Sequence, residues 1–504
     1  MKADRIEITP LAYTKITYCE IKKAVNAHGE AVVKGYIEPE KEQEYLSRAC
    51  RQTEISIEAI DEDGTRKVIY CGILKDLVIQ HKNSVCEMEL SAAPFTYLLD
   101  LNPVKRSFQI PSMTYQEVFG CVLGGYAGGN VLMNTGASAA IGEPIVQYQE
   151  TDWEFALRLA SHFHTVIIPS YVTSGPKLYL GLSGQGRGTQ IAPVCYRAKK
   201  AVSEYLYKEQ NQVNGIAEDD SLWYIVEDQE LYEIGEEVVF QGKTYYIAQS
   251  DAKLDGHQLW NTYQLRTQNG FKVPKLYNER VIGASLDGKI TAVNADVVRA
   301  SLGTDAKSGE GKWFSFSTVY SSPDGSGWYC MPEPGDEIRL YFPTEKEKHA
   351  YVISAVHLPV AEPDAGETGK SSNGGGSSKA VGGNQIQTAG TGKAGGNKSP
   401  GAKRSDPDYK TIRTTSGKMV ELSPQGIVLD SGDGMRVELS DKKGISIVSH
   451  LGVTIETPEL VNISSLEGKV EIMGAEGVDL KQGTGKIEVA SDNVVFYGAN
   501  SKVQ

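Results

Sequence analysis

The sequence lacks paired cysteine motifs and long apolar runs. Its seven cysteines are dispersed, and none stands in a C-x-x-C pair. A scattered, odd-numbered set indicates reduced cysteines in a protein made in the cytosol. No run approaches the roughly 18 apolar residues of a membrane-spanning helix, and no apolar signal-peptide segment follows Met1. We therefore expect synthesis and assembly in the cytoplasm, and any release from the cell by a route that uses no signal peptide.

Positive charge is also in deficit. The chain has 51 Lys and Arg residues against 64 Asp and Glu residues, for a net charge of −13. This balance argues against a general binder of nucleic acid or of an anionic membrane surface. A hydrophobic content of 40% with 23% charged residues is ordinary for a soluble globular protein, and 504 residues suggest three or four domains.

Recognisable catalytic motifs are missing as well. The sequence contains no G-x-S-x-G, H-E-x-x-H or paired Cys/His arrangement. The one His-x-His is His162-Phe163-His164, and residues two apart on a helix point in different directions. The carboxylates of the C-terminal region alternate with apolar residues, so each is expected to face solvent on its own strand. We predict that the protein is not an enzyme, with no catalytic or metal-binding residues.

Short glycine-rich and acidic loops do not change that prediction. Residues 61–64 and 430–434 superficially resemble calcium loops, but neither has the terminal glutamate of an EF-hand. Residues 124–129 and 184–188 are rich in glycine, but neither lies between a strand and an amphipathic helix. Turn formation explains them better, and we predict no cofactor.

Residues 1–278 are mostly strand-like. Runs of β-branched and aromatic residues are separated by Asp-Gly and Gln-Gly turns. Thr114 and Thr151 each begin a T-x-x-E capping box, which predicts a helix after each. Two strand-rich halves with helices between them suggest a pair of small barrels.

The next two segments differ in kind. Residues 279–360 carry short strand patterns and clustered aromatic residues, which suit a small five-stranded barrel used as a spacer. Residues 361–407 are rich in Gly, Ser, Ala and Lys, almost without large apolar residues, and so cannot bury a core. We interpret them as a flexible linker; a docking segment for another component is the alternative.

Residues 408–504 contain a short glycine-led repeat. The glycines stand eight to ten residues apart, or sixteen where one is missed, at 417, 426, 434, 444, 452, 468, 477 and 485. Most are followed by alternating apolar and polar residues, as in Gly434–Leu439, which is typical of a strand with one buried face. A fixed short period predicts a stacked array.

The length of the repeat favours three chains over one. A single-chain β-helix needs three strands and three corners a turn, roughly 20–25 residues, whereas eight residues give one strand and one corner. Three eight-residue repeats of one chain could still close one turn of a β-helix, but around a thin core. We favour a needle of three intertwined chains whose strands pair with neighbouring chains and leave no open edge. The predicted trimer core consists of Ile427, Leu429, Val437, Leu439, Ile445, Ile447, Val453, Ile455, Val470, Ile472, Val478, Leu480, Ile487 and Val489.

Several segments resemble one family. Tyr148–Ala160 (YQETDWEFALRLA) is similar to a helix motif of the hub-and-spike proteins of contractile injection systems, namely VgrG proteins of type VI secretion and the hub and puncturing proteins of phage tails. Arg106–Gln109 resembles an arginine-led strand of that family, and Gly327–Ile338 its oligonucleotide-binding (OB) fold segment. Thr411–Lys418 is similar to the start of the spike, although many relatives have histidine where this chain has Lys418.

The resemblance implies a mainly β protein. Its parts would be an N-terminal double-barrel hub with a few helices, a small OB-type barrel and a C-terminal intertwined trimeric β-helix. Three hubs would form a pseudo-sixfold ring that matches a hexameric inner-tube protein on a baseplate. On contraction the needle would leave the particle and touch a target membrane transiently.

The end of the needle calls for a cap. Val494, Val495, Phe496 and Tyr497 would expose the apolar end of the stack, and we predict that a PAAR-type tip protein covers them. The alternatives are a carbohydrate-active or receptor-binding β-helix tailspike and a passive assembly scaffold. The first would need a carboxylate cluster in a groove and longer, irregular turns.

Overall fold

The structure is a computed structural model. It describes residues 1–51, 53–83, 85–182, 188–193, 195–256, 258–319, 331–355, 410–413, 416–483, 485–489 and 494–498. The predicted linker 361–407 and the first residues of the 327–338 motif lie outside the described residues. The chain divides into two compact units, Met1–Leu358 and Pro359–Gln504.

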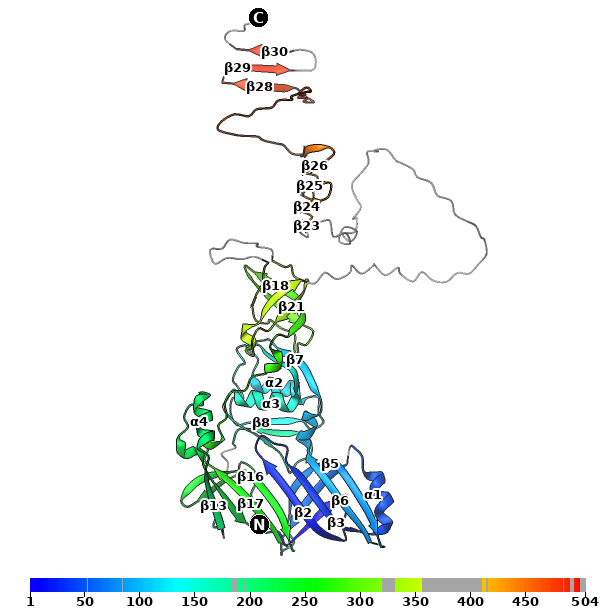
Figure 1. The fold of residues 1–504 in the computed structure, drawn as a ribbon, viewed down its shortest axis with the longest axis vertical. Helices are drawn as coiled ribbons and strands as arrows, with labels where there is room; N and C mark the ends of the chain where they lie inside the picture. The colour runs from blue at the N-terminus through cyan, green and yellow to red at the C-terminus, as the bar shows by residue number, and fades with distance from the viewer. Residues whose placement is uncertain are drawn as a thin grey trace, which may run out of the picture. The chain divides into compact units, whose positions relative to one another are not determined.

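One twelve-stranded sheet dominates the first unit (Figure 1). Its path runs β1-β4-β5-β6-β3-β2-β16-β17-β14-β13, and β15 pairs with both β16 and β12. The strands are β1 (Arg5–Thr9), β2 (Lys15–Ala24), β3 (Glu30–Ile37), β4 (Glu54–Ile60), β5 (Arg66–Lys82), β6 (Val85–Pro94), β12 (Thr189–Gln190), β13 (Cys195–Lys200), β14 (Leu222–Asp228), β15 (Glu237–Phe240), β16 (Lys243–Asp255) and β17 (Gln258–Arg266). Antiparallel pairing of β2 with β16 joins the two predicted strand-rich halves into one sheet.

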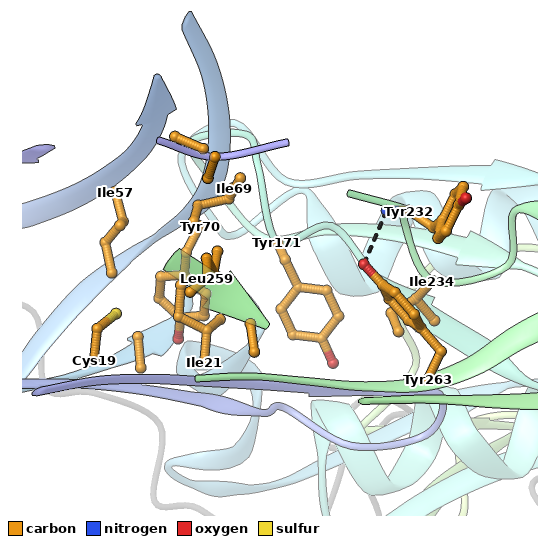
Figure 2. Close-up of a cluster of buried hydrophobic side chains, with 14 of the residues drawn as sticks. Cys19, Ile21, Ile57, Ile69, Tyr70, Tyr171, Tyr232, Ile234, Leu259 and Tyr263 are labelled. Carbon is orange, nitrogen blue, oxygen red and sulfur yellow. Dashed lines mark hydrogen bonds between the residues drawn. The ribbon is translucent and has the colours of Figure 1, made fainter. Parts of the chain in front are cut away.

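The sheet is held by a large apolar and aromatic core. In β3, Ala31 and Val33 are fully buried while their neighbours are partly exposed, which is the period-two pattern of a strand with one covered face. Figure 2 shows side chains from both halves of the sheet around Tyr171. The Tyr263 hydroxyl accepts a hydrogen bond from the Tyr232 backbone N–H at 3.0 Å, so this buried polar group is satisfied.

Helices α2 (Tyr115–Leu123) and α3 (Asp152–Ser161) begin at the two predicted capping boxes. Thr114 accepts a hydrogen bond from the backbone N–H of Glu117, and Thr151 does the same for Glu154, with both reciprocal bonds present. The helices share a second core with two small sheets, β7 (Pro103–Phe108) with β9 (Ile145–Thr151), and β10 (Ile167–Pro169), β11 (Lys177–Leu180) and β8 (Asn130–Met133).

Two further α-helices were not predicted. They are α1 (Glu42–Arg48) and α4 (Val202–Gln210). Neither has a side chain that caps its first turn, so the signal that identified α2 and α3 is missing. Short 3-10 turns are η1 (Pro39–Lys41), η2 (Phe95–Asp100), η3 (Glu218–Ser221), η4 (Asn269–Phe271), η5 (Glu279–Val281) and η6 (Glu347–His349). No described helix has the length and apolar character needed to cross a membrane.

A small five-stranded barrel ends the first unit. Its order is β20-β19-β18-β21-β22, formed by β18 (Ser285–Asn294), β19 (Val297–Leu302), β20 (Phe314–Ser315), β21 (Glu337–Tyr341) and β22 (Tyr351–Ala355). A bridge from Phe316 to Val352 links the first strand to the last and closes the sheet. We call this element, residues 285–355, the small barrel.

The second unit contains two separate sheets. Strands β23 (Lys410–Arg413), β24 (Met419–Ser423), β25 (Gly426–Asp430), β26 (Arg436–Ser440) and β27 (Gly444–Val448) form an antiparallel meander, which we call the proximal sheet. Strands β28 (Val478–Gln482), β29 (Gly485–Val489) and β30 (Val494–Tyr497) form the distal sheet.

The pairing within these sheets differs from the sequence-based expectation in two respects. Consecutive strands pair inside one chain, whereas we expected each strand to pair with neighbouring chains. No strand is present between Val448 and Val478, all described residues, although the sequence predicts strands there. Two successive repeats that are joined by a tight turn pair with each other within the chain. The repeats between residues 449 and 477 have no backbone partner among the described residues.

Candidate functional site

The proximal sheet places six of the predicted core residues on one face. Residues directly opposite in antiparallel strands share a face, and the register puts Ile427 opposite Leu439, and Leu429 opposite Val437. Two aliphatic rows result, which together we call the apolar face: Val420, Leu429, Val437 and Ile447, and Leu422, Ile427, Leu439 and Ile445.

The apolar face is uncovered in the single chain. Ile445 is 73% exposed and Ile447 is 58% exposed. On the opposite face, Val428 and Glu421 are buried. Exposed aliphatic side chains arranged in continuous rows are unusual on the surface of a soluble monomer.

A groove runs along the first row of the apolar face. It encloses about 690 Å³ and is open to solvent, and Val420, Leu429, Val437 and Ile447 line it. Val453 reaches the same groove from the segment after β27, although it belongs to no strand. The groove is therefore an extension of the apolar face and contains no cluster of acidic side chains.

The distal sheet sorts its side chains in the same way. Val478 lies opposite Val489, and Leu480 lies opposite Ile487, so these four predicted core residues share one face. The other face carries ion pairs, in which Lys486 Nζ lies 3.0 Å from Asp479 and 2.9 Å from Glu488. These contacts lower the pKa of the Asp479 carboxyl, chiefly through the hydrogen bond from Lys486.

The predicted tip residues are divided between the two faces of β30. Val494 pairs with Val489 and Phe496 with Ile487, so both lie on the apolar side of the distal sheet. Val495 and Tyr497 lie on the charged side, where the Lys486 ammonium is 5.8 Å from the centre of the Tyr497 ring. β30 is also an edge strand, with one side unpaired within the described residues.

Four predicted core residues lie outside any strand. They are Val453, Ile455, Val470 and Ile472, and each is between 47% and 68% exposed. The structure brings them into no common face beyond the contact of Val453 with the groove. Their role in a core stays a prediction.

The family-like helix motif forms a buried ionic centre between α3 and the small barrel. The Arg158 guanidinium is 2% exposed and donates to both carboxylate oxygens of Glu150 at 2.8 Å. The Arg158 Nη1 donates to Glu347 of η6, in the small barrel, at 2.9 Å, and Nη2 also donates to the Val146 carbonyl at 2.8 Å. A planar guanidinium satisfied on all sides fixes the distance and angle between the two elements.

Charges in this centre respond to burial and to each other. Burial raises the pKa of Glu150, and the nearby Arg158 only partly offsets the effect. Burial also disfavours the charged form of Arg158, but the charges of Glu347 and Glu150 outweigh it and raise the pKa of Arg158. The guanidinium therefore stays charged, and the centre depends on all three side chains.

A second buried group joins the arginine-led strand to the same helix. Arg106 of β7 makes an ion pair with Asp152, the first residue of α3, and donates to Gln147 at 3.0 Å. The Tyr126 hydroxyl donates to Asp152 at 2.8 Å, and burial followed by this bond raises the pKa of Tyr126 to about 12.

Further contacts of these motifs also lead to the small barrel. Gln109 donates to Asp305, which follows β19, and Ser107 donates to the same carboxylate at 2.6 Å. Arg280 donates to both oxygens of Glu154 at 2.6 and 2.7 Å. We call these contacts, together with the Arg158 centre, the junction. Sequence reasoning identified the motifs as family signatures but did not assign them this role.

The two histidines of the His-x-His have separate partners. His162 Nδ1 lies 2.8 Å from the Tyr115 hydroxyl, and His164 Nδ1 lies 2.9 Å from the Val273 carbonyl. Burial, with smaller contributions from Lys275 and Arg158, lowers the pKa of His162 to about 3. Each histidine thus has a hydrogen-bond partner of its own within the first unit.

Comparisons with solved structures return a type VI secretion component, VgrG complexes and phage tail proteins. The chain is similar to the E. coli c3393 protein, a type VI secretion component described as structurally similar to T4 bacteriophage tail proteins. The identity is 13% and the TM-score 0.48, over 69% of this chain and 99% of that one. It is also similar to a Francisella PdpA–VgrG complex, with 9% identity and a TM-score of 0.48 over 88% and 87% of the two chains.

A third similar structure is the 43 kDa tail protein of prophage MuSo2 from Shewanella oneidensis. The identity is 13% and the TM-score 0.40, over 55% of this chain and 99% of that one. No family model and no curated protein matches the chain. The chain is similar in structure to VgrG and phage tail proteins. These are the proteins that its sequence motifs resemble.

Proposed function

We propose that the protein is the homotrimeric hub and spike of a contractile injection system. In this proposal residues 1–278 are the hub that meets a hexameric inner tube and the baseplate, and the small barrel follows it in the chain. The second unit assembles with two other copies into a needle that pierces a membrane or cell envelope on contraction. The role is mechanical, and no enzymatic step is part of it.

The observation that carries the proposal is the uncovered apolar face of the proximal sheet. Burying an aliphatic side chain fully contributes roughly 1.5–3 kcal/mol. Eight such residues on each of three chains would therefore supply a large driving force for association about one axis. A monomer would leave this surface in water, which soluble proteins avoid.

The junction, which lies in the first unit, supports the same role. A spike must move with its hub when force is applied, and free rotation between the hub and the small barrel would reduce the force that reaches the needle. The buried contacts of Arg158 oppose such a hinge because their geometry tolerates little rotation. Arg280 of η5, just before the small barrel, adds an exposed bidentate contact to Glu154. We infer that the hub and the small barrel move as one body.

The partners follow from this arrangement. The baseplate and inner tube would hold the hub in the cytoplasm, and the needle would leave the particle on firing. A PAAR-type tip protein would cover the end near β30 and carry an effector or sharpen the point. The unpaired edge of β30 and the apolar side chains of Val494 and Phe496 offer it a surface.

The proposal predicts that Ile447→Asp prevents trimer formation. The variant would place three charges around one axis inside the apolar core, where an unpaired carboxylate is strongly disfavoured. The mass of the full chain in solution, measured by light scattering during gel filtration, should change from three chains to one.

Ser446→Asp is the matched control. It introduces the same charge one residue away, on the opposite face of the same strand. Trimers should persist in this variant. A monomeric wild-type protein, or equal behaviour of the two variants, would contradict the proposed assembly.

A further inference from the structure

Three side chains with different metal-ligating atoms meet at one end of the large sheet. Glu42 is the first residue of α1, His81 lies near the end of β5 and Cys86 near the start of β6. One ligand atom from each lies within 4.8 Å of the other two. The hairpin register sets His81 directly opposite Cys86, and Glu42 Oε2 lies 3.3 Å from His81 Nδ1.

The local structure fixes this meeting point. β5 and β6 are long, fully paired strands, so the positions of His81 and Cys86 follow from the hairpin. β6 also pairs with β3, where Ile37 lies opposite Cys86, and α1 begins a few residues after Ile37. The chain therefore returns Glu42 to the hairpin end by a short connection.

A thiolate, an imidazole and a carboxylate form the donor set of a borderline-soft cation. Zn²⁺ accepts all three in tetrahedral geometry, whereas Mg²⁺ and Ca²⁺ prefer oxygen ligands alone. Cys86 is 1% exposed, and the His81 side chain is half exposed. A bound ion would thus have a protein-covered side and a side open to water.

A metal ion binds the thiolate form of cysteine, so zinc binding would release the proton of the buried Cys86 thiol. A divalent ion held between Cys86 and Glu42 would favour that thiolate. The His81 imidazole would be the third protein ligand, through a ring nitrogen.

We propose that Glu42, His81 and Cys86 form a zinc site with water as the fourth ligand. The site fastens the start of α1 to the turn end of the β5–β6 hairpin, and its function is to stabilise that corner of the first unit. This assignment is independent of the proposed hub-and-spike role and could fail or hold without it.

The test uses the full chain without a histidine tag. The exposed thiols of Cys50 and Cys195 are first replaced by serine, so that they cannot compete for the metal. After removal of metal with a chelator, the protein is titrated with Zn²⁺ and, separately, with Co²⁺. We expect about one ion bound per chain and a thiolate-to-cobalt charge-transfer band in the near ultraviolet.

Two ligand variants and two controls decide the result. His81→Ala and Cys86→Ser should lower the zinc affinity by more than about 100-fold, since even outer-shell changes cost about 10- to 100-fold. Zinc should raise the melting temperature of the parent protein but not that of either variant. His349→Ala and Cys71→Ser replace an exposed histidine and a buried cysteine outside the cluster and should leave both readouts unchanged.

His81→Ala carries the test alone if Cys86→Ser does not fold, because His81 is half exposed and its truncation leaves the core intact. The proposal is overturned if the parent protein binds no zinc. It is also overturned if His81→Ala retains the parent's affinity, or if Cys71→Ser loses binding to the same extent as Cys86→Ser.

Discussion

At the scale of single residues, buried charges determine how the first unit responds to mutation and to acid. Each of the three guanidinium nitrogens of Arg158 donates to a carboxylate or a carbonyl. Removing the guanidinium would leave Glu150 and Glu347 facing each other without a counter-ion. A buried pair broken in this way costs far more than the pair contributed when intact.

We therefore expect Arg158→Ala to destabilise the first unit by about 3–5 kcal/mol. Lys307→Ala is the control, since it removes one exposed ion pair with Glu117 and should cost less than about 1 kcal/mol. Urea unfolding followed by tryptophan fluorescence measures both. Equal, small losses of unfolding free energy in the two variants would show that the Arg158 centre does not stabilise the first unit.

His162 predicts a pH dependence of stability. Its pKa falls from an ordinary 6.5 to about 3 on folding, because it is buried beside cationic groups. The unfolded chain therefore binds one more proton between these values, and stability is fully present above pH 6.5 and falls as pH decreases. The slope contributed is at most about 1.4 kcal/mol per pH unit.

Replacing the ring tests this contribution. His162→Asn should flatten the stability profile between pH 6.5 and pH 5 relative to the wild type, measured as the melting temperature at each pH. His349→Asn, at an exposed position in η6, should leave the profile unchanged. A wild-type profile that is already flat over this window would contradict the assignment.

At the scale of elements, glycine positions in the second unit control strand pairing. Gly426 has φ near +145°, and a Cβ there would lie 2.0 Å from the Leu439 carbonyl oxygen in the neighbouring strand. Gly434 also has a positive φ, but a Cβ would meet no atom within 4 Å. The first glycine is required by close approach of two strands and the second only by a turn.

Gly426→Ala should therefore separate β25 from β26 and abolish trimer assembly. Gly434→Ala should cost only about 1 kcal/mol of backbone strain and leave trimers intact. Light scattering with limited proteolysis of the C-terminal region distinguishes the two outcomes. Normal trimers in Gly426→Ala would mean that the assembled needle does not use this pairing.

The elements also show what sequence patterns can locate. The capping boxes at Thr114 and Thr151 predict both central helices, because a reciprocal cap is a local arrangement of four residues. Alternation in 426–448 identified the apolar side of the proximal sheet. α1 and α4 were missed because their ends carry no cap, and tertiary packing decides whether such short segments become helical.

At the scale of the whole molecule, contacts between residues far apart in the sequence could not be predicted from local sequence patterns. β2 and β16 meet although they are more than two hundred residues apart, and no local signal marks either as the other's partner. Arg158 and Glu347 are 189 residues apart, and Glu42 and His81 are 39 apart, and again no local signal pairs them. The sequence could name the motifs and the apolar positions, but only the fold shows that the motifs meet at the junction.

The position of the apolar face in the chain has a consequence for synthesis. A ribosome makes the amino-terminal unit first, and domains generally fold as they emerge. The aliphatic rows of the apolar face leave the ribosome after that unit, which can already be folded by then. In the proposed trimer, three chains would therefore associate through these rows only after their first units have folded, and the time during which the exposed rows can bind an unrelated protein would be short.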